Sequence, residues 1–316
     1  MRHLAVDLRP LVCLACPKRS KHLSTEYYSI FKSIKYVYNL VENLEAMASF
    51  SGRRITLFKN RVGPSVVYQD SLLNTLENVH SNFYRTCQLQ FDNVYLSRDD
   101  IQACQEFMYR KLMTFHVHSP FTVNLASAKG AVVGNSKKSL NTILSQIAEL
   151  DATCIVHCGS VGTLDQVVNN INSLNPKGVL LLENSAGEGT QLGSTIEEIE
   201  YLMSNITRPN IGLCIDTQHA FASGISSWDV YEDSMEILDR YNQIAPVRLI
   251  HLNDSKVQCG SRVDSHEVIG RGNIWSNPRD WGGLIGILDW CIQHNVDIVE
   301  ETSNSQDSIS FLRSML

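Results

Sequence analysis

Six short apolar runs in this chain each end in a histidine or a carboxylic acid, and this recurrence restricts the possible folds more than any other feature. The runs are Thr114 to His118, Thr153 to His157, Val179 to Glu183, Ile211 to Asp216, Val247 to His251 and Val296 to Glu301. They are rich in β-branched residues and alternate with segments of helical periodicity, which is the pattern of a chain that builds a parallel sheet. The candidate helices include Ser139 to Leu150, Ser194 to Asn205, Trp228 to Tyr241 and Pro278 to His294.

Two more strands are expected upstream, at Arg54 to Phe58 and, more weakly, near Tyr27 to Phe31, with a helix over about Ser33 to Ser49 between them. Eight strands with intervening helices predict an α/β fold, the (β/α)8 or TIM barrel, and 316 residues suit one such domain. We expect an N-terminal extension, a single barrel domain and a long insertion after the second strand, over residues 1–23, 24–316 and about 63–96 respectively.

Composition is that of a globular protein, because 43% of the residues are apolar and 19% are charged. No run approaches the roughly 20 apolar residues that span a bilayer, so no membrane association is expected. The apolar segment LVCLAC is followed by Pro-Lys-Arg-Ser-Lys rather than by a cleavage site, which argues against a signal peptide. The nine cysteines are therefore expected as free thiols in a reducing intracellular compartment. This compartment is the nucleus or cytoplasm, or the host cell or virion if the protein is viral. The Cys13-x-x-Cys16 pair is interpreted as incidental.

The six strand ends are separated by 39, 26, 33, 35 and 50 residues, and each interval accommodates a strand-helix-strand unit. Because the carboxyl ends of barrel strands converge at one end of the barrel, the six terminal side chains should meet in one pocket. A single histidine or acid at a strand end is usually just solvated, but six in succession indicate a metal site. Three more candidates follow these ends, namely His219, Asp264 and His266.

The nine candidates comprise five histidines and four carboxylates. Imidazole and carboxylate ligands suit Zn, with Mn or Fe as possible substitutes, and exclude a structural thiolate site. Nine ligands are too many for one or two ions, but with one bridging carboxylate they suit three. Glycine-rich segments after Glu183 and at Gly270-Arg271-Gly272 lack the pattern of a phosphate-binding loop, and we interpret the first as a tight loop beside the metals.

Four long motifs carry a family resemblance. They are HSPFTVNLA from His118, LLENSAGEGTQLG, IGLCIDTQHAFASG and IHLNDSKVQCGSRVDSHEVIGRGNI. These motifs resemble the endonuclease IV family of apurinic/apyrimidinic endonucleases (AP endonuclease family 2), and the similarity runs from about Ser33 to the C-terminus apart from the expected insertion. The resemblance implies a TIM barrel that holds three zinc ions through nine ligands.

By this resemblance, His118 and His157 hold the first ion and Glu183 bridges it to the second. The second ion is completed by Asp216, His251 and Glu301, and the third is held by His219, Asp264 and His266. The implied activity is DNA repair in the base excision pathway, by hydrolysis of the phosphodiester 5′ to an abasic site in double-stranded DNA. The products are a 3′-hydroxyl and a 5′-deoxyribose phosphate, and Glu183 and Glu301 are expected to position or deprotonate the attacking water.

DNA contacts are expected from residues on the strand-end loops, and the protein is expected to act as a monomer. The candidates are Lys59, Arg61, Phe121, Lys129, Lys256, Arg262 and Arg271. The net charge of −6 argues against a DNA-binding protein, but bound divalent ions reverse the local field around acidic ligands.

The sequence departs from the family pattern at five positions without losing a ligand. These are Phe121 (usually Tyr), Gln218 (usually Cys), Ser265 (usually Arg or Pro), Glu188 and Trp275. Two alternative functions remain open. One is a metal-dependent sugar isomerase on a similar barrel, which leaves His219 and the Asp264/His266 pair unexplained, and the other is a non-catalytic damaged-DNA-binding protein, which is expected to have lost ligands.

Overall fold

A computed structural model describes residues 61–68, 70–90 and 96–315, all of which lie in one compact unit, Arg53–Leu316. Eight parallel strands close into a barrel in the order β1-β10-β7-β6-β5-β4-β3-β2. The strands are β1 (Val62–Val66), β2 (Thr86–Gln90), β3 (Thr114–His118), β4 (Thr153–His157), β5 (Val179–Glu183), β6 (Ile211–Asp216), β7 (Val247–His251) and β10 (Asp297–Glu300). The predicted TIM barrel is therefore confirmed.

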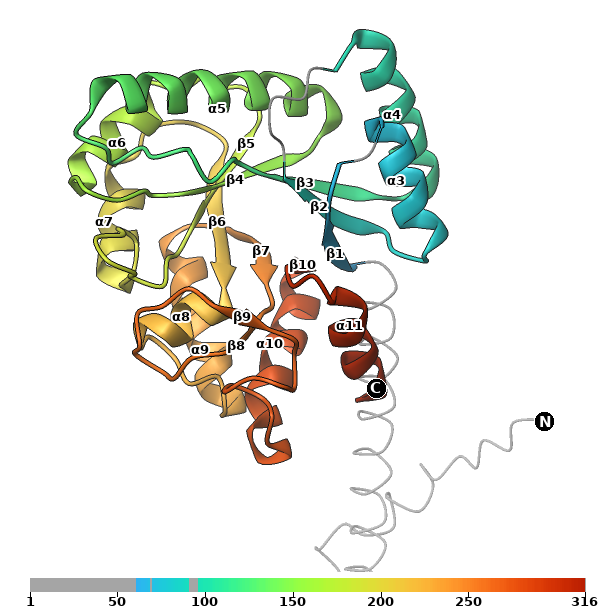
Figure 1. The fold of residues 1–316 in the computed structure, drawn as a ribbon, viewed down its shortest axis with the longest axis vertical. Helices are drawn as coiled ribbons and strands as arrows, with labels where there is room; N and C mark the ends of the chain where they lie inside the picture. Colours follow the sequence, from blue (N-terminus) through green and yellow to red (C-terminus); the bar gives the residue numbers. More distant parts are fainter. Residues whose placement is uncertain (1–60, 69, 91–95, 316) are drawn as a thin grey trace, which may run out of the picture. The chain divides into compact units, whose positions relative to one another are not determined.

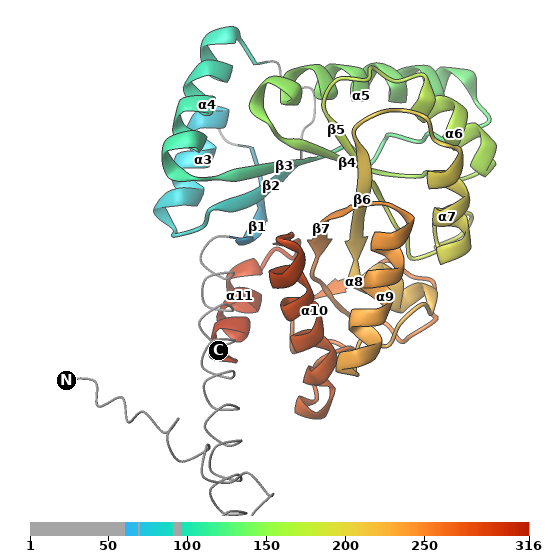
Figure 2. The ribbon, with the colours of Figure 1, turned by 180° about the vertical axis from the view of Figure 1, so that it is seen from behind.

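Helices connect successive strands and surround the barrel, and α11 follows the last strand (Figure 1; Figure 2 shows the other side). They are α3 (Leu72–Ser81), α4 (Arg98–Lys111), α5 (Gly130–Leu150), α6 (Leu164–Asn172), α7 (Ile196–Asn205), α8 (Thr217–Ser223), α9 (Tyr231–Ile244), α10 (Trp281–His294) and α11 (Ser305–Ser314). A 3-10 turn, Pro278–Asp280, precedes α10, and a short hairpin, β8 (Asp254–Ser255) with β9 (His266–Glu267), follows β7. In the described part of the chain, no helix combines the length and apolarity needed to cross a membrane.

Local signals explain where several helices begin. Ser97 and Thr163 each form a capping box, with Asp100 in α4 and Gln166 in α6, so that the first free amide groups of both helices are bonded. Helix α5 starts nine residues before the predicted Ser139, at Gly130.

The predicted insertion over about 63–96 is wrong, because this part of the chain supplies the first two barrel strands and α3. The sequence signal of β1 is weak, since its sequence VGPSV contains Gly63 and Pro64, which are unusual inside strands. Gly63 is required by packing, because a Cβ atom there would lie 1.9 Å from the carbonyl oxygen of Thr86 on β2. Strand β2, TCQLQ, is equally hard to recognise because it carries two glutamines.

The other upstream predictions, the strands at Arg54 to Phe58 and Tyr27 to Phe31 and the helix at Ser33 to Ser49, lie outside the described residues. The eight strands of the closed barrel are all at or after Val62. The extension 1–23 also lies outside the described residues, and the domain boundary at residue 24 stays a prediction.

Strand alternation builds the barrel interior in layers. Residues two positions before a strand-end ligand face inward below it, and five of them form a separate apolar cluster, comprising Ile155, Leu181, Cys214, Leu249 and Val299. This layer separates the strand-end side chains from a second polar group near the amino ends of the strands, described below.

Candidate metal centre

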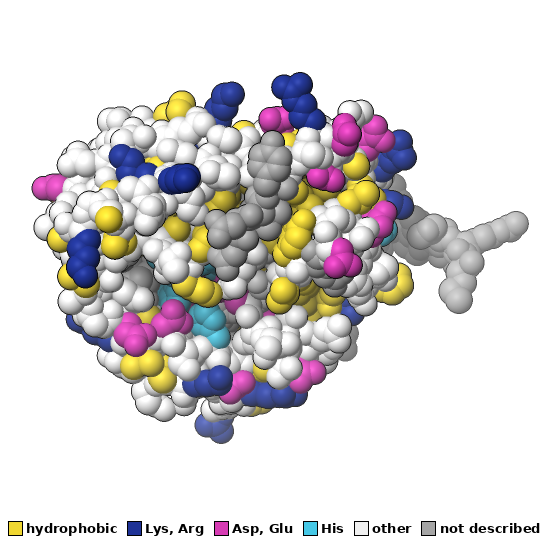
Figure 3. Space-filling view, turned by 45° about the horizontal axis from the view of Figure 1, so that its top comes forward, with side chains coloured by type: hydrophobic (Ala, Val, Ile, Leu, Met, Phe, Trp, Pro, Cys, Tyr) yellow, Lys and Arg dark blue, Asp and Glu magenta, His cyan; other side chains and the backbone are white. Residues whose placement is uncertain are grey.

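The nine predicted ligands stand where the barrel topology brings them together. Four end strands β3, β4, β5 and β7, namely His118, His157, Glu183 and His251, while Asp216 ends β6 and Glu301 follows β10 directly. His219 lies in the first turn of α8, Asp264 in the loop between β8 and β9, and His266 in β9. Figure 3 shows histidine side chains at the base of a surface hollow with acidic side chains beside them.

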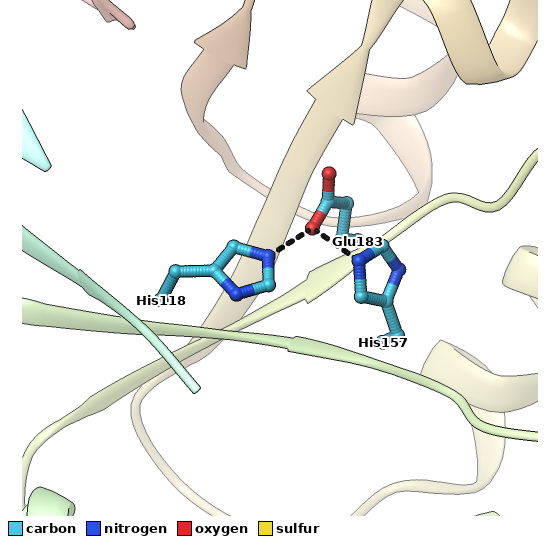
Figure 4. A group of neighbouring side chains, drawn as sticks. All are labelled: His118, His157 and Glu183. Carbon is cyan, nitrogen blue, oxygen red and sulfur yellow. Dashed lines mark hydrogen bonds and ion pairs between the residues drawn. The ribbon is translucent and has the colours of Figure 1, made fainter. Parts of the chain in front are cut away.

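Glu183 lies at the centre of this cluster. Its Oε2 atom is 3.2 Å from Nε2 of His118 and 3.3 Å from Nε2 of His157, so both rings point to one carboxylate oxygen (Figure 4). Its other oxygen, Oε1, is 2.8 Å from Nδ1 of His251 and 3.6 Å from Nδ1 of His219. The carboxylate therefore joins the His118–His157 side of the cluster to the His251 side.

Three overlapping groups offer ligand atoms within 4.8 Å of one another and contain predicted ligands alone. They are His118–His157–Glu183, Glu183–Asp216–His251–Glu301 and Asp216–His219–His266. Asp264 joins the third group through Oδ2, 3.2 Å from Nε2 of His219, and Oδ1, 3.5 Å from Nε2 of His266. Asp264 is the most exposed of the nine, with a side chain 35% accessible.

Burying these carboxylates costs free energy unless a positive charge compensates them. Burial raises the pKa of the Glu183 carboxyl, but the neighbouring charges of His157 and His251 and hydrogen bonds from His118 and His251 outweigh it, so the pKa falls well below its ordinary value. Burial lowers the pKa of His219, whereas the carboxylates of Asp216 and Asp264 raise it more strongly, to about 10. Without metal, protons on imidazole rings must therefore balance the acids.

The donor chemistry fits divalent metal ions. Within the described residues, three buried ring nitrogens make no hydrogen bond of acceptable geometry, namely Nδ1 of His157 and Nε2 of His219 and His266. The latter two lie close to carboxylate oxygens but are not aligned with them as hydrogen-bond donors. Imidazole nitrogens and carboxylate oxygens that converge without hydrogen bonding are a suitable environment for Zn²⁺ or a similar ion.

Cys214 forms a fourth group with Glu183 and His251. It lies in the apolar layer beneath the ligands, and burial raises the pKa of its thiol to about 12. His251 also faces Glu183, Asp216 and Glu301, and this carboxylate-rich side is the better place for a divalent cation than the apolar layer.

Two amide side chains belong to the site although the sequence analysis did not select them. Gln88, on β2, donates to Oε1 of Glu301 at 2.6 Å and lies 2.7 Å from Nε2 of His251. Asn253 donates to Oδ2 of Asp216 at 2.7 Å and to Oε2 of Glu301 at 3.1 Å. Asn253 lies inside the IHLND motif, which could have identified it as a site residue. Gln88 lies in the expected insertion and was therefore not considered.

The Gly270-Arg271-Gly272 segment wraps a buried carboxylate rather than a phosphate. Asp254 accepts hydrogen bonds from the backbone amides of Gly270, Gly272 and Ile274 at 2.9–3.1 Å. A Cβ atom on Gly272 would lie 2.4 Å from Oδ1 of Asp254, which explains the glycine. The segment thus anchors the hairpin that carries His266.

The predicted DNA contacts divide into three groups. Lys59 lies outside the described residues. Lys129, Lys256 and Arg262 are exposed on loops beyond the strand ends, and the Phe121 side chain is 77% exposed with its ring centre 5.8 Å from that of His118. These positions are compatible with DNA contact, which stays a prediction.

Two arginines have protein partners. Arg61 precedes β1 at the opposite end of the barrel, where its Nη1 is 2.7 Å from Oδ1 of Asp297, the first residue of β10. Its expected place on a strand-end loop is therefore wrong. The error followed from treating Arg54 to Phe58 as a barrel strand. Arg271 pairs with Asp307 of α11 at 3.0 Å, and both side chains remain more than half exposed.

Three of the five departures from the family pattern have structural roles. Gln218 is buried and donates to the carbonyl oxygen of Val263, beside Asp264. Glu188 accepts from the backbone amide of Asp264 at 3.3 Å. Trp275 is fully buried and donates to the carbonyl oxygen of Trp228, so it belongs to the core.

Comparison with known proteins agrees with this geometry. Residues 79–314 match the xylose isomerase-like TIM barrel family. The chain is 31% identical over 202 residues to a protein named probable endonuclease 4 from Thermoplasma volcanium, a match covering 61% of this chain and 71% of that protein.

Among solved structures, endonuclease IV from Thermus thermophilus superposes with a TM-score of 0.68 and 25% identity, over 81% of this chain and 97% of that one. A D-tagatose 3-epimerase-like protein shares the fold with a TM-score of 0.60 and 21% identity, over 81% and 95% of the two chains.

Proposed function

Because this chain belongs to the endonuclease IV family of xylose isomerase-like TIM barrels, we propose that it is a zinc-dependent apurinic/apyrimidinic endonuclease. Its substrate is double-stranded DNA with an abasic site, and it hydrolyses the phosphodiester on the 5′ side of that site. The observation that carries the proposal is the position of Glu183, whose two carboxylate oxygens face two different groups of ligand side chains.

Three metal ions are proposed per chain. His118, His157 and Glu183 hold the first ion, Glu183 with Asp216, His251 and Glu301 holds the second, and His219, Asp264 and His266 hold the third. Bound divalent ions lower the pKa of water and neutralise phosphate charge. Four carboxylates in a small volume need this compensation, which also removes the objection that the net charge of −6 raises against DNA binding.

The protein's own residues orient the reaction. Glu183 and Glu301 are proposed to position the attacking water and to accept its proton, as the bond from phosphorus to the 3′ oxygen of the preceding nucleotide breaks. The side chain of Asn253 accepts from the backbone amide of Glu301 and donates to the Glu301 carboxylate, so that this carboxylate keeps one orientation. The leaving oxygen takes a proton and becomes the 3′-hydroxyl.

Binding must also present the scissile phosphate to the site. An abasic nucleotide has no base to unpair or unstack, which reduces the cost of turning it out of the duplex. Lys129, Lys256 and Arg262 are proposed to hold backbone phosphates, and the exposed ring of Phe121 is proposed to stack in the gap left by the missing base.

A sugar isomerase or epimerase on the same barrel is the competing function. The D-tagatose 3-epimerase-like protein is less than 25% identical to this chain, so its likeness concerns the fold alone. The third ligand group, Asp216–His219–His266 with Asp264, favours the nuclease, because it extends the centre beyond what one or two ions need. A non-catalytic DNA-binding role is disfavoured because all nine ligands are present and converge.

The test is incision of a duplex with one abasic site by purified protein whose metal content has been measured. We expect about three divalent ions per chain, with zinc favoured, cleavage 5′ to the abasic site, loss of activity after chelation and recovery on adding zinc. The same duplex with an intact base is the control substrate, and a set of ketoses tests epimerisation. Metal-loaded protein that leaves abasic DNA intact would overturn the proposal.

A further inference from the structure

One amide side chain binds two of the proposed ligands at the same time. Gln88 is fully buried on β2, and its Nε2 donates to Oε1 of Glu301 at 2.6 Å, while its Oε1 lies 2.7 Å from Nε2 of His251. His251 ends β7 and Glu301 directly follows β10, and these two strands are neighbours in the barrel. Gln88 therefore connects β2 to ligands from two other strands.

The hydrogen-bonding capacity of these groups determines the direction of both bonds. The NH2 group of Gln88 faces Oε1 of Glu301, because only this end of the amide can donate to a carboxylate oxygen. The amide oxygen then faces His251, and because that oxygen also only accepts, the ring must donate from Nε2. With the proton on Nε2, a neutral His251 ring has its lone pair on Nδ1.

Nδ1 of His251 faces the centre of the proposed second metal site. It lies 2.8 Å from Oε1 of Glu183, 3.2 Å from Oε2 of Glu301 and 3.9 Å from Oδ2 of Asp216. The bond from Gln88 to Oε1 of Glu301 leaves Oε2 directed to the same place. Gln88 thus occupies one atom of each ligand, so that Nδ1 of His251 and Oε2 of Glu301, which also accepts from Asn253, are directed inward.

We propose that Gln88 is a positioning residue for the second ion, which selects Nδ1 as the ligand atom of His251 and Oε2 as the ligand atom of Glu301. The inference rests on the proposed metal centre and adds a residue to its supporting shell. Groups that bond to metal ligands in this way restrict their orientation, and their loss typically lowers metal affinity by about 10–100-fold.

The experiment compares Gln88→Met with the parent protein, because methionine keeps the approximate volume and removes both hydrogen bonds. Gln146→Met is the matched control, since Gln146 is a buried glutamine on α5 that accepts from the backbone amide of Leu96. Metal retention is measured against increasing chelator, together with the melting temperature. We expect Gln88→Met to release one ion in three at a chelator concentration about 10–100-fold lower than the parent does. Gln146→Met should lower the melting temperature without changing metal retention.

A second measurement does not depend on how the variant folds. In zinc-loaded parent protein with ¹⁵N-labelled histidine, His251 should appear with its proton on Nε2 and its metal on Nδ1. Ligation through Nε2, or parental metal retention in Gln88→Met, would overturn the role of Gln88 alone. A parent that binds metal but does not cut abasic DNA contradicts the nuclease proposal alone, and a parent that binds no divalent metal contradicts both.

Discussion

The side-chain amide of Asn253 donates a 2.7 Å hydrogen bond to Oδ2 of Asp216, and both residues are completely buried. The same amide reaches Oε2 of Glu301 at 3.1 Å, and its oxygen accepts from the backbone amide of Glu301. Asn253 therefore couples the end of β6 to the residue that follows β10.

Replacing Asn253 by alanine should leave these buried acceptors without their donor. Each unsatisfied buried polar group costs about 1–3 kcal/mol, so Asn253→Ala should lower the free energy of unfolding by at least about 1 kcal/mol and reduce incision. Urea denaturation measures the first effect. Asn205→Ala is the control, because Asn205 is exposed at the end of α7 and bonds locally to Tyr201. Equal stability of the two variants would contradict the coupling.

Glu183→Gln should produce the largest loss of activity. The substitution keeps the size of the side chain and removes the charge that both ligand groups share, so both metal sites should weaken. Single groups that stabilise a transition state often contribute about 10²–10³-fold in rate, and we expect at least this loss in incision. Duplex affinity should change less because the proposed DNA contacts lie on other loops.

The control for this substitution is Glu197→Gln, because Glu197 is exposed on α7 and pairs with Arg240. Circular dichroism verifies that both variants are folded. If folded Glu183→Gln cuts abasic DNA within a few-fold of the parent rate, Glu183 is not the shared ligand.

Phe121→Ala should weaken binding to abasic duplex while metal content stays constant. Stacking of a base on an aromatic ring is worth about 1–3 kcal/mol, so the dissociation constant should rise by about tenfold. Phe83→Ala is a matched control, since Phe83 is 83% exposed but precedes β2 at the opposite end of the barrel. Fluorescence anisotropy with an abasic duplex measures both variants, and equal affinities would remove Phe121 from the interface.

Asp297→Asn should change the pH dependence of stability without involving the metal centre. Asp297 lies below the apolar layer and bonds to Arg61 at 2.7 Å and to His116 at 3.2 Å. Burial raises the pKa of its carboxyl. The hydrogen bond from His116 and the charges of His116 and Arg61 lower this pKa by more than burial raises it, so the net shift is downward.

A lowered pKa means that the ionised form stabilises the folded state. This contribution is complete above the ordinary aspartate pKa of about 3.9 and disappears as the pH falls through the lower value in the folded protein. At pH 7 the variant should be less stable than the parent by about 1.5–3 kcal/mol, the usual contribution of a hydrogen bond to a charged group. Denaturation from pH 7 downward should show the stability difference shrinking once the pH falls below about 3.9, and a difference independent of pH would contradict this assignment.

The convergence of the six candidate ligands at the strand ends could be predicted from the sequence because each is tied to a local pattern. A buried parallel strand is an apolar run, and its carboxyl end is visible as the residue where the run stops. All such ends lie on one side of a barrel, so His118, Glu183 and His251 are brought together by topology alone. The local pattern failed where strands are not apolar. The first two strands, β1 and β2, were not recognised because β1 contains Gly63 and Pro64 and β2 contains two glutamines.

The hydrogen bonds that orient the ligands were decided by tertiary structure. Gln88 and Glu301 are 213 residues apart, and Asn253 and Asp216 are 37 apart. Neither amide belongs to a periodic pattern, since each is required by the acceptors and donors that packing places beside it. Periodicity records which face of a strand or helix is buried, whereas the partner of a buried polar group depends on barrel closure and register, which bring β2 beside residues from the other end of the chain.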